Sequence, residues 1–229
     1  MLHGFLPSLL EGSAVTLAVA LSSLAIAALL GLIGALAKLS RSRVARAVAA
    51  TYTTLIRGVP DLVLMLLVFY GGQLAINTIA PKLGHEDFID IDPFFAGVMT
   101  IGFIFGAYLT EAFRGAFLAV PSGQREAGLA YGMSPLLVLW RITLPQMLRH
   151  ALPGISNNWL VLIKSTAIVS VIGLSDLMTR GKQAAGTTRE PFTFFLAVAL
   201  IYLVFTSVSE LLFAWAQRRL AIGTKAGKL

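Results

Sequence analysis

Five long stretches of the sequence carry almost no charge, and they constrain the fold more than any other feature. They are 12–37, 62–81, 93–110, 151–175 and 191–209. Lys164, within 151–175, is the one charged residue in these ranges. A helix that crosses a bilayer needs about 20 apolar residues, so each stretch is long enough to span a membrane. The pattern predicts an all-α, polytopic membrane protein with spans at about 12–38, 60–81, 92–115, 149–175 and 191–217.

The composition supports a chain that is solvated by lipid. Hydrophobic residues make up 57% of the sequence and charged residues 13%, whereas soluble domains carry about 25% charged residues. Five spans leave little of the 229 residues for an extramembrane domain, so we expect one transmembrane domain over 1–229. The net charge of +7 then indicates a membrane topology rather than nucleic-acid binding. The absence of cysteine and the scattered positions of three histidines predict no metal site.

The basic residues are distributed unevenly between the two sides of the predicted bundle. The first connection, the third connection and the C-terminal tail hold thirteen of the 18 Lys and Arg residues, including Lys225 and Lys228. The opposite side holds four, and it also carries the acidic cluster of Glu86, Asp87, Asp90 and Asp92. Because basic loops favour the cytoplasm, we expect the N-terminus outside and the C-terminus inside. Within the first connection, 41–56 is expected to form an interfacial helix.

The third connection is too orderly for a simple linker. Ser122 is expected to cap a first short helix that Gly132 ends, because glycine tolerates the left-handed conformation of a helix end. Ser134 is expected to cap a second short helix with Pro135 at its first position, and Pro145 to interrupt or kink the chain near the membrane.

Apolar residues of this pair lie beside the charged residues Arg125, Glu126 and Arg141. An apolar surface with a charged rim is suited to docking another protein. A lid lying on lipid headgroups would need the same pattern, so both interpretations remain open from the residues alone.

The same segment carries a sequence motif. Glu126-Ala127-Gly128, then Gly132, then Ile142-Thr143-Leu144-Pro145 resembles the EAA motif of bacterial ABC importer permeases. Gly128 stands where alanine is usual, which we expect to loosen the first helix slightly. The resemblance implies that the loop at about 121–145 forms coupling helices seated on an ATPase subunit. The implied coupling residues are Glu126, Ala127, Gly128, Gly132, Arg141, Ile142, Leu144 and Pro145.

Other segments extend the resemblance over nearly the whole chain. Segments 52–60, 108–115, 152–159 and 164–167 resemble permeases of the polar amino acid group, and details such as Asp61 and the Asn157-Asn158 pair are similar to histidine/lysine/arginine/ornithine or arginine–ornithine importers.

The resemblance also implies the setting of the chain. It would be a multi-pass protein of the bacterial inner membrane that forms half of a pathway for a basic L-amino acid. Implied partners are two copies of an ATP-binding subunit, a sibling permease or second copy of this chain, and a periplasmic amino-acid-binding protein. ATP and Mg would reside on the ATPase, with no cofactor in this chain, because the nearest P-loop candidate, 223–229, is one residue short.

Polar groups inside the spans are costly and therefore candidate pathway residues. Asp61 would attract a cationic solute or pair with Arg57 four residues earlier. Glu111 would line the pathway or, as we favour, form a structural ion pair with Arg114.

Four further candidates lie in the fourth span. Lys164 would hold a substrate carboxylate or pair with an acid on another helix. Asn157, Asn158 and Ser165 would bind substrate or connect helices by hydrogen bonds. Asn157 and Lys164 are seven residues apart and share a helix face, which makes this face the first candidate for the pathway.

The composition is also compatible with two other classes of membrane protein. A secondary transporter or channel would work without an ATPase, but an odd number of spans and the lack of a visible inverted repeat disfavour it. An intramembrane enzyme would need a catalytic motif such as H-E-x-x-H or G-x-S-x-G, and the sequence contains neither.

Overall fold

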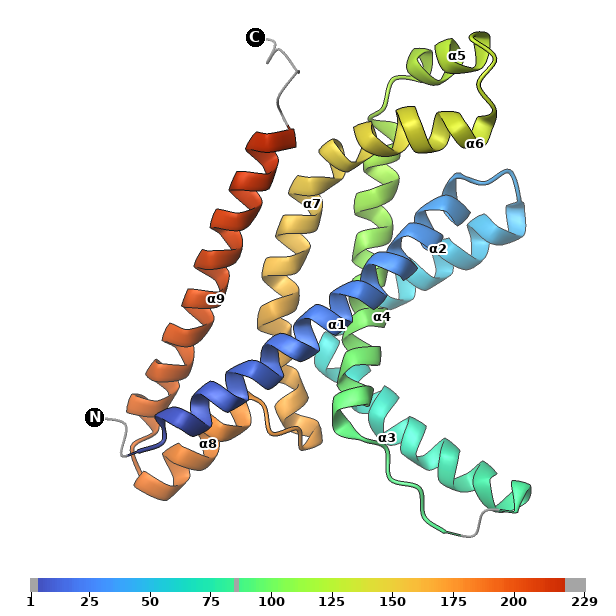
Figure 1. Ribbon diagram of the computed structural model, residues 1–229. Helices are drawn as coiled ribbons and strands as arrows, with labels where there is room; N and C mark the ends of the chain where they lie inside the picture. Colours follow the sequence, from blue (N-terminus) through green and yellow to red (C-terminus); the bar gives the residue numbers. More distant parts are fainter. Residues whose placement is uncertain (1–3, 85–86, 221–229) are drawn as a thin grey trace.

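A computed structural model describes residues 4–84 and 87–220, and every regular element in these ranges is a helix. Glu86, Lys225 and Lys228 therefore lie outside the described residues. In chain order the elements are α1 (Leu6–Leu39), α2 (Arg43–Gly58), α3 (Asp61–Ile79), η1 (Ala80–Leu83), α4 (Pro93–Leu118), α5 (Ser122–Ala130), α6 (Pro135–Val138), η2 (Leu139–Thr143), α7 (Leu144–Ser165), η3 (Thr166–Ile172), α8 (Leu177–Thr188) and α9 (Pro191–Leu220) (Figure 1).

Five helical segments are long and apolar enough to cross a membrane, which confirms the predicted number of spans. Three of them match the predicted ranges to within a few residues. The first helix, α1, begins at Leu6 rather than near residue 12. The early start adds the charged residue Glu11 to the helix, where Arg180 of α8 pairs with it at 2.7 Å. A partner for the charge explains why the helix extends beyond the uncharged stretch.

The helix that contains the predicted fourth span, 149–175, begins before that span. The apolar helical segment runs from Pro135 to Ile172, because α6 continues into α7 through the π-helical turn η2. Pro145 lies in the first turn of α7, where its missing N–H is tolerated. The π-helical turn just before Pro145 keeps the chain helical where we expected an interruption.

Helix α4 is the centre of the molecule and packs against α1, α2, α3 and α7 (Figure 1). Glycines at the contact between α4 and α1 allow the two helix backbones to approach closely. A Cβ on Gly102 or Gly106 of α4 would lie 2.8 Å from Ile26 or 2.9 Å from Leu30, and one on Gly34 of α1 would lie 2.3 Å from the Thr110 hydroxyl. The Gly102-x-x-x-Gly106 pair thus allows close helix packing within the chain.

The predicted helix of the first connection is confirmed as α2, which packs along α1 and α4. Its Tyr52 hydroxyl donates to the Phe103 carbonyl at 2.5 Å.

Helix α8 was not expected. It is capped by Asp176, whose carboxylate accepts from the Thr179 N–H at 2.9 Å, and it packs with the start of α1 and α9 around the buried Leu9 and Phe194. Figure 1 shows α8 at the end of the molecule opposite α5 and α6.

Candidate coupling surface and pathway residues

Helices α5 and α6 project as a pair from one end of the bundle (Figure 1). Gly132 ends α5 with a left-handed φ of 78°, and the Met133 N–H donates to the Gly128 carbonyl at 3.1 Å. The Ser134 hydroxyl accepts from the Leu137 N–H at 3.3 Å, with Pro135 as the first residue of α6. These features confirm the predicted turn. Ser122 is instead the first residue of α5 and makes no capping hydrogen bond.

Gly128 allows α5 to pack closely on α6 and η2. It is the buried residue of α5, and a Cβ there would lie 2.6 Å from Ile142 Cδ1 and 3.0 Å from Val138 Cγ2. Glycine therefore lets α5 approach α6 and η2 closely, which gives the departure from alanine a packing role rather than a loosening one. Ile142 and Leu144 are partly buried, and Leu144 packs against the main hydrophobic core.

The outer side of the pair carries large apolar side chains that the bundle does not cover. Tyr131 is 90% exposed, and the others are Leu129, Leu136, Leu137 and Trp140. Charged side chains adjoin them, because Arg125, Glu126 and Arg141 are also exposed. We call these eight residues the coupling surface. Of them, the sequence motif singles out Glu126 and Arg141, and the sequence also predicts apolar residues of the two short helices beside Arg125, Glu126 and Arg141.

The other predicted coupling residues divide into two groups. Ala127 and Pro145 are exposed beside the coupling surface. Gly128, Ile142 and Leu144 support it from beneath, while Gly132 shapes its turn. The arrangement contains no reacting constellation: it combines apolar anchors with a charged rim, which is the anatomy of a surface that binds another protein.

Near the C-terminal end of α4, the Glu111 carboxylate forms ion pairs with two basic side chains. One carboxylate oxygen pairs with Lys38 of α1, and the other accepts from the Arg114 guanidinium at 3.0 Å. Lys38 also donates to the Thr53 hydroxyl at 2.6 Å, so α1, α2 and α4 meet here. The predicted Glu111–Arg114 pair is confirmed. The role of Lys38 was missed, because nothing in the sequence brings residues 73 positions apart together.

The predicted Asp61–Arg57 pair is wrong. Arg57 belongs to α2, which ends at Gly58, and Asp61 begins α3, so the two do not share a continuous helix. The Arg57 guanidinium instead lies 5.3 Å from the centre of the Tyr108 ring on α4. Within the described part of the chain, Asp61 has no ion pair, and its side chain is partly exposed at the start of α3.

The face of α7 that carries Asn157 and Lys164 is open. Both residues are exposed, whereas the Asn158 amide donates to the Gly154 carbonyl at 2.8 Å and Ser165 is half-buried. Lys164 lines a surface pocket of about 360 Å³ with residues of α8 and α9, among them Met178 and Tyr202. No carboxylate in residues 4–84 and 87–220 pairs with Lys164. The structure thus brings Asn157 and Lys164 onto one free face but does not join them to Asp61 or Glu111.

Among the residues that the structure describes, no group of three or more His, Cys, Asp or Glu could hold a metal ion.

Comparison with known proteins defines the class. Residues 27–222 match the model of the family described as "Binding-protein-dependent transport system inner membrane component". The chain belongs to this family and is a permease subunit of an ABC importer, in which a separate subunit hydrolyses ATP.

The relatives narrow the class further. The chain is 53% identical over 229 residues, the full length of both chains, to the histidine/lysine/arginine/ornithine transport system permease protein HisQ of Salmonella typhimurium. It is 42% identical to the octopine transport system permease protein OccQ of Agrobacterium tumefaciens, over 96% of this chain and 92% of that one. A crystal structure of an amino acid ABC transporter with histidines superposes with a TM-score of 0.78 at 32% identity, covering 93% of this chain and 94% of that chain.

These findings confirm the resemblance inferred from the EAA motif. They lend no support to the alternative of a secondary transporter or channel that works without an ATPase.

Proposed function

We propose that this chain forms half of a transmembrane pathway for a basic L-amino acid such as histidine, arginine, lysine or ornithine. The observation that carries the proposal is the full-length similarity to a permease named for these four solutes. The octopine relative is a second, more distant permease named for a nitrogen-rich solute.

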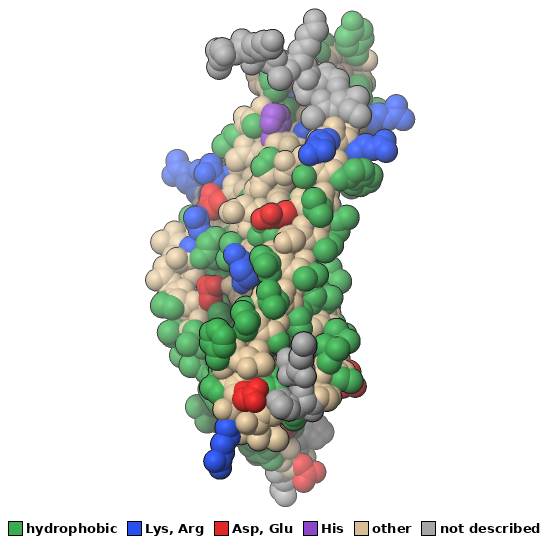
Figure 2. Space-filling view, turned by 90° about the vertical axis from the view of Figure 1, so that its left-hand side faces the viewer, with side chains coloured by type: hydrophobic (Ala, Val, Ile, Leu, Met, Phe, Trp, Pro, Cys, Tyr) green, Lys and Arg blue, Asp and Glu red, His purple; other side chains and the backbone are tan. Residues whose placement is uncertain are grey.

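The coupling surface is the proposed contact with the ATPase. Its exposed apolar residues need a partner, because large contiguous apolar surfaces in contact with water are unfavourable. The basic residues concentrate at this end of the molecule, as the upper part of Figure 2 shows, which supports a cytoplasmic location with the N-terminus outside. The proposed assembly contains two ATPase copies that bind ATP and Mg, a sibling permease or second copy, and a periplasmic binding protein in a bacterial inner membrane.

The open face of α7 is the proposed wall of the pathway. Asn157 and Lys164 are exposed in this single chain, although each lies in a segment apolar enough to span the membrane. Polar groups at this depth normally face a water-filled cavity or another protein chain. Asp61 is a second proposed contact with a cationic solute, whereas Glu111 is already bound by Lys38 and Arg114 and is assigned a structural role.

Uptake into proteoliposomes tests the proposal. The complex that co-purifies with this tagged chain would be reconstituted with its binding protein and supplied with radiolabelled arginine, histidine, lysine, ornithine or glutamate. We expect ATP-dependent uptake of one or more basic amino acids and none of glutamate. Uptake of glutamate alone, or uptake of a basic amino acid without ATP, would contradict it.

A conservative variant then tests the pathway wall. Lys164→Gln removes the charge but keeps a polar side chain, and we expect it to raise the KM for uptake while ATP hydrolysis without substrate stays unchanged. Arg189→Gln, an exposed cation after α8, is the matched control. Identical KM values for both variants and the unmodified complex would remove Lys164 from the pathway.

A further inference from the structure

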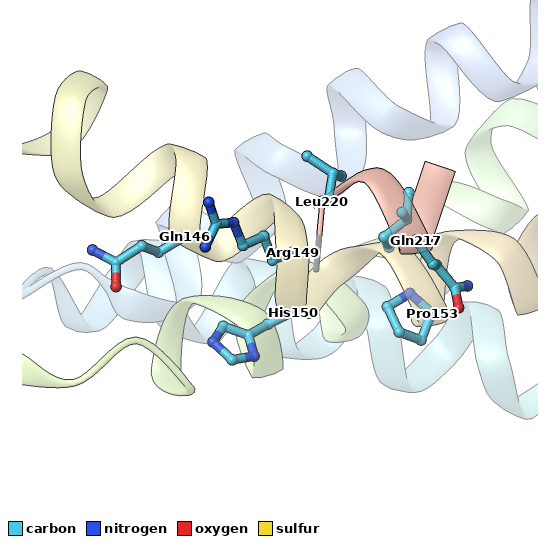
Figure 3. Close-up of a pocket in the computed structure, with 7 residues that line it drawn as sticks. Gln146, Arg149, His150, Pro153, Gln217 and Leu220 are labelled. Atoms are coloured by element: carbon cyan, nitrogen blue, oxygen red, sulfur yellow. The ribbon is translucent and has the colours of Figure 1, made fainter. Parts of the chain in front are cut away.

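A polar pocket opens between α7 and α9 at the end of the bundle that carries the coupling surface. It encloses about 390 Å³, and Figure 3 shows the side chains around it: Gln146, Arg149, His150 and Pro153 from α7, and Gln217 and Leu220 from α9. Neither the coupling surface nor the exposed Asn157–Lys164 face of α7 uses these residues. The pocket therefore needs its own explanation.

The pocket offers groups that bind a phosphate. Arg149 is an exposed cation, and His150 is an exposed side chain that can form hydrogen bonds. No carboxylate in the described ranges, 4–84 and 87–220, pairs with Arg149. The Arg149 guanidinium can form bidentate hydrogen bonds with phosphate oxygens, whereas Figure 3 shows the Gln217 amide beside Pro153. Pro153 has no N–H to donate to the Arg149 carbonyl, so this acceptor lacks its α-helical partner and is available to a hydroxyl or ammonium group.

An apolar groove continues from this pocket along the same two helices. It encloses about 390 Å³ between α1, α7 and α9, and its lining includes Trp159, Leu212 and Phe213. Leu152 lines both the polar pocket and the groove, so the two are adjacent. From the pocket to the groove, the lining shifts from Gln217 toward Ser209 on α9 and from Arg149 toward Trp159 on α7, which is the direction into the predicted membrane.

The last turns of α9 place the polar pocket at the level of lipid headgroups. Arg218 and Arg219 follow the apolar part of α9, and the Arg219 guanidinium lies 5.6 Å from the centre of the Trp215 ring. Tryptophan and arginine are enriched together at membrane interfaces. A cationic pocket at this level with an apolar groove beneath it has the shape and polarity of one phospholipid molecule.

We propose that the α7–α9 groove is a binding site for an anionic phospholipid. Arg149 holds the phosphate, the carbonyl that Pro153 leaves without an α-helical partner accepts a headgroup hydroxyl, and an acyl chain fills the groove beside Trp159. The site ties α9 to α7 at the end where α7 leads back to the coupling surface. The proposal does not depend on which solute the importer carries.

Native mass spectrometry of the purified complex in detergent tests the headgroup pocket. The delipidated complex would be titrated with phosphatidylglycerol and, separately, with phosphatidylcholine of the same acyl chains. We expect phosphatidylglycerol to bind more tightly and Arg149→Gln to weaken it about fivefold, since one Lys or Arg near an anionic lipid contributes about that much. Arg43→Gln, an exposed arginine at the start of α2, is the matched control and should bind as the unmodified complex does.

Fluorescence tests the acyl groove. In a Trp140→Phe/Trp215→Phe background Trp159, which is 6% exposed, is the one tryptophan of this chain, and a complex that also carries Trp159→Phe gives the signal of the other subunits to be subtracted. Phosphatidylglycerol with brominated acyl chains should quench Trp159, and Arg149→Gln should reduce quenching to the level of brominated phosphatidylcholine. Equal binding of both lipids, equal effects of Arg149→Gln and Arg43→Gln, or no quenching of Trp159 would overturn the proposal. The last result would also indicate that another subunit covers the groove.

Discussion

At the residue scale, Glu111 is an internal anion rather than a free pathway carboxylate. Its side chain is 23% exposed and that of Lys38 15%, so both charges are largely removed from water and each needs the other. Removing one partner of such a pair leaves an uncompensated charge, which costs more than the pair contributes.

We predict that Glu111→Gln lowers the free energy of unfolding of the purified complex by about 1–3 kcal/mol, because Lys38 and Arg114 lose their carboxylate partner. The double variant Lys38→Met/Glu111→Gln should recover part of this loss, since the isolated cation is gone. Thermal unfolding in detergent measures the stability, and uptake assays measure the KM. A stable Glu111→Gln complex with a strongly raised KM would return Glu111 to the substrate pathway.

Asp176 is a second residue whose environment makes a measurable prediction. It is fully buried before α8, and its second carboxylate oxygen has no hydrogen-bond partner among the described residues. Burial raises the pKa of this carboxyl, although hydrogen bonds from Thr179 and the charge of Lys182 oppose the shift. A raised pKa in the folded state means that stability is lost as pH rises from the usual carboxyl range through the raised value.

We predict that Asp176→Asn is at least as stable as the unmodified complex at pH 7.5, because asparagine also caps a helix and carries no buried charge. The difference in unfolding temperature should shrink as pH falls, because the raised pKa lets the native carboxyl gain its proton above the usual carboxyl range. Asp176→Ala loses the cap and should be less stable by about 1 kcal/mol. If Asp176→Asn is less stable than the native complex only at pH 7.5, the carboxylate has a charged partner that this single chain does not contain.

At the element scale, the α5–α6 turn depends on one backbone conformation. Gly132 has a φ of 78° and no atom near its Cβ direction, so a side chain there is opposed by backbone strain rather than by a clash. A residue with a Cβ costs about 1–2 kcal/mol in this conformation. The strain would tilt α6 relative to α5 and displace the apolar anchors of the coupling surface.

We predict that Gly132→Ala lowers uptake by more than it lowers ATP hydrolysis, so that fewer solute molecules move per ATP. Gly123→Ala is the control, because Gly123 is exposed within α5, has an ordinary φ and likewise has no neighbour within 4 Å. Both activities would be measured in the same proteoliposomes. Equal uptake in the two variants would show that the shape of the turn does not transmit the motion of the ATPase.

Elements differ in how far the sequence could predict them. The number of spans followed from uncharged length, and the Gly132–Ser134 turn followed from capping chemistry, because both are local properties. Helix α8 was missed: it is short and contains Arg180, Lys182 and Gly181, and it is held by packing on α1 and α9. The continuity of α6 with α7 was missed because a proline normally indicates a break, whereas the π-helical turn before Pro145 accommodates it.

At the scale of the whole molecule, the EAA resemblance predicted which loop contacts the ATPase, but the sequence could not assign roles to the polar residues inside the spans. Their roles depend on tertiary contacts. Lys38 forms an ion pair with Glu111, and the Arg57 guanidinium lies over the Tyr108 ring. Asn157 and Lys164 are exposed. The bundle is built around α4, which packs against α1, α2, α3 and α7. One exposed coupling surface and one open face of α7 agree with the proposed role of this chain as half of a transporter.

The central claim is that the coupling surface binds the ATPase, and site-specific photo-crosslinking in native membranes tests it most directly. A photoreactive amino acid would replace Tyr131, which is 90% exposed between α5 and α6, or Phe192, which is 80% exposed at the opposite end of the molecule. We predict that the probe at position 131 captures the ATP-binding subunit and that the probe at position 192 does not. Capture of the ATPase from position 192, or its failure from position 131 in an assembled complex, would contradict both the assignment of this surface and the proposed orientation of the chain.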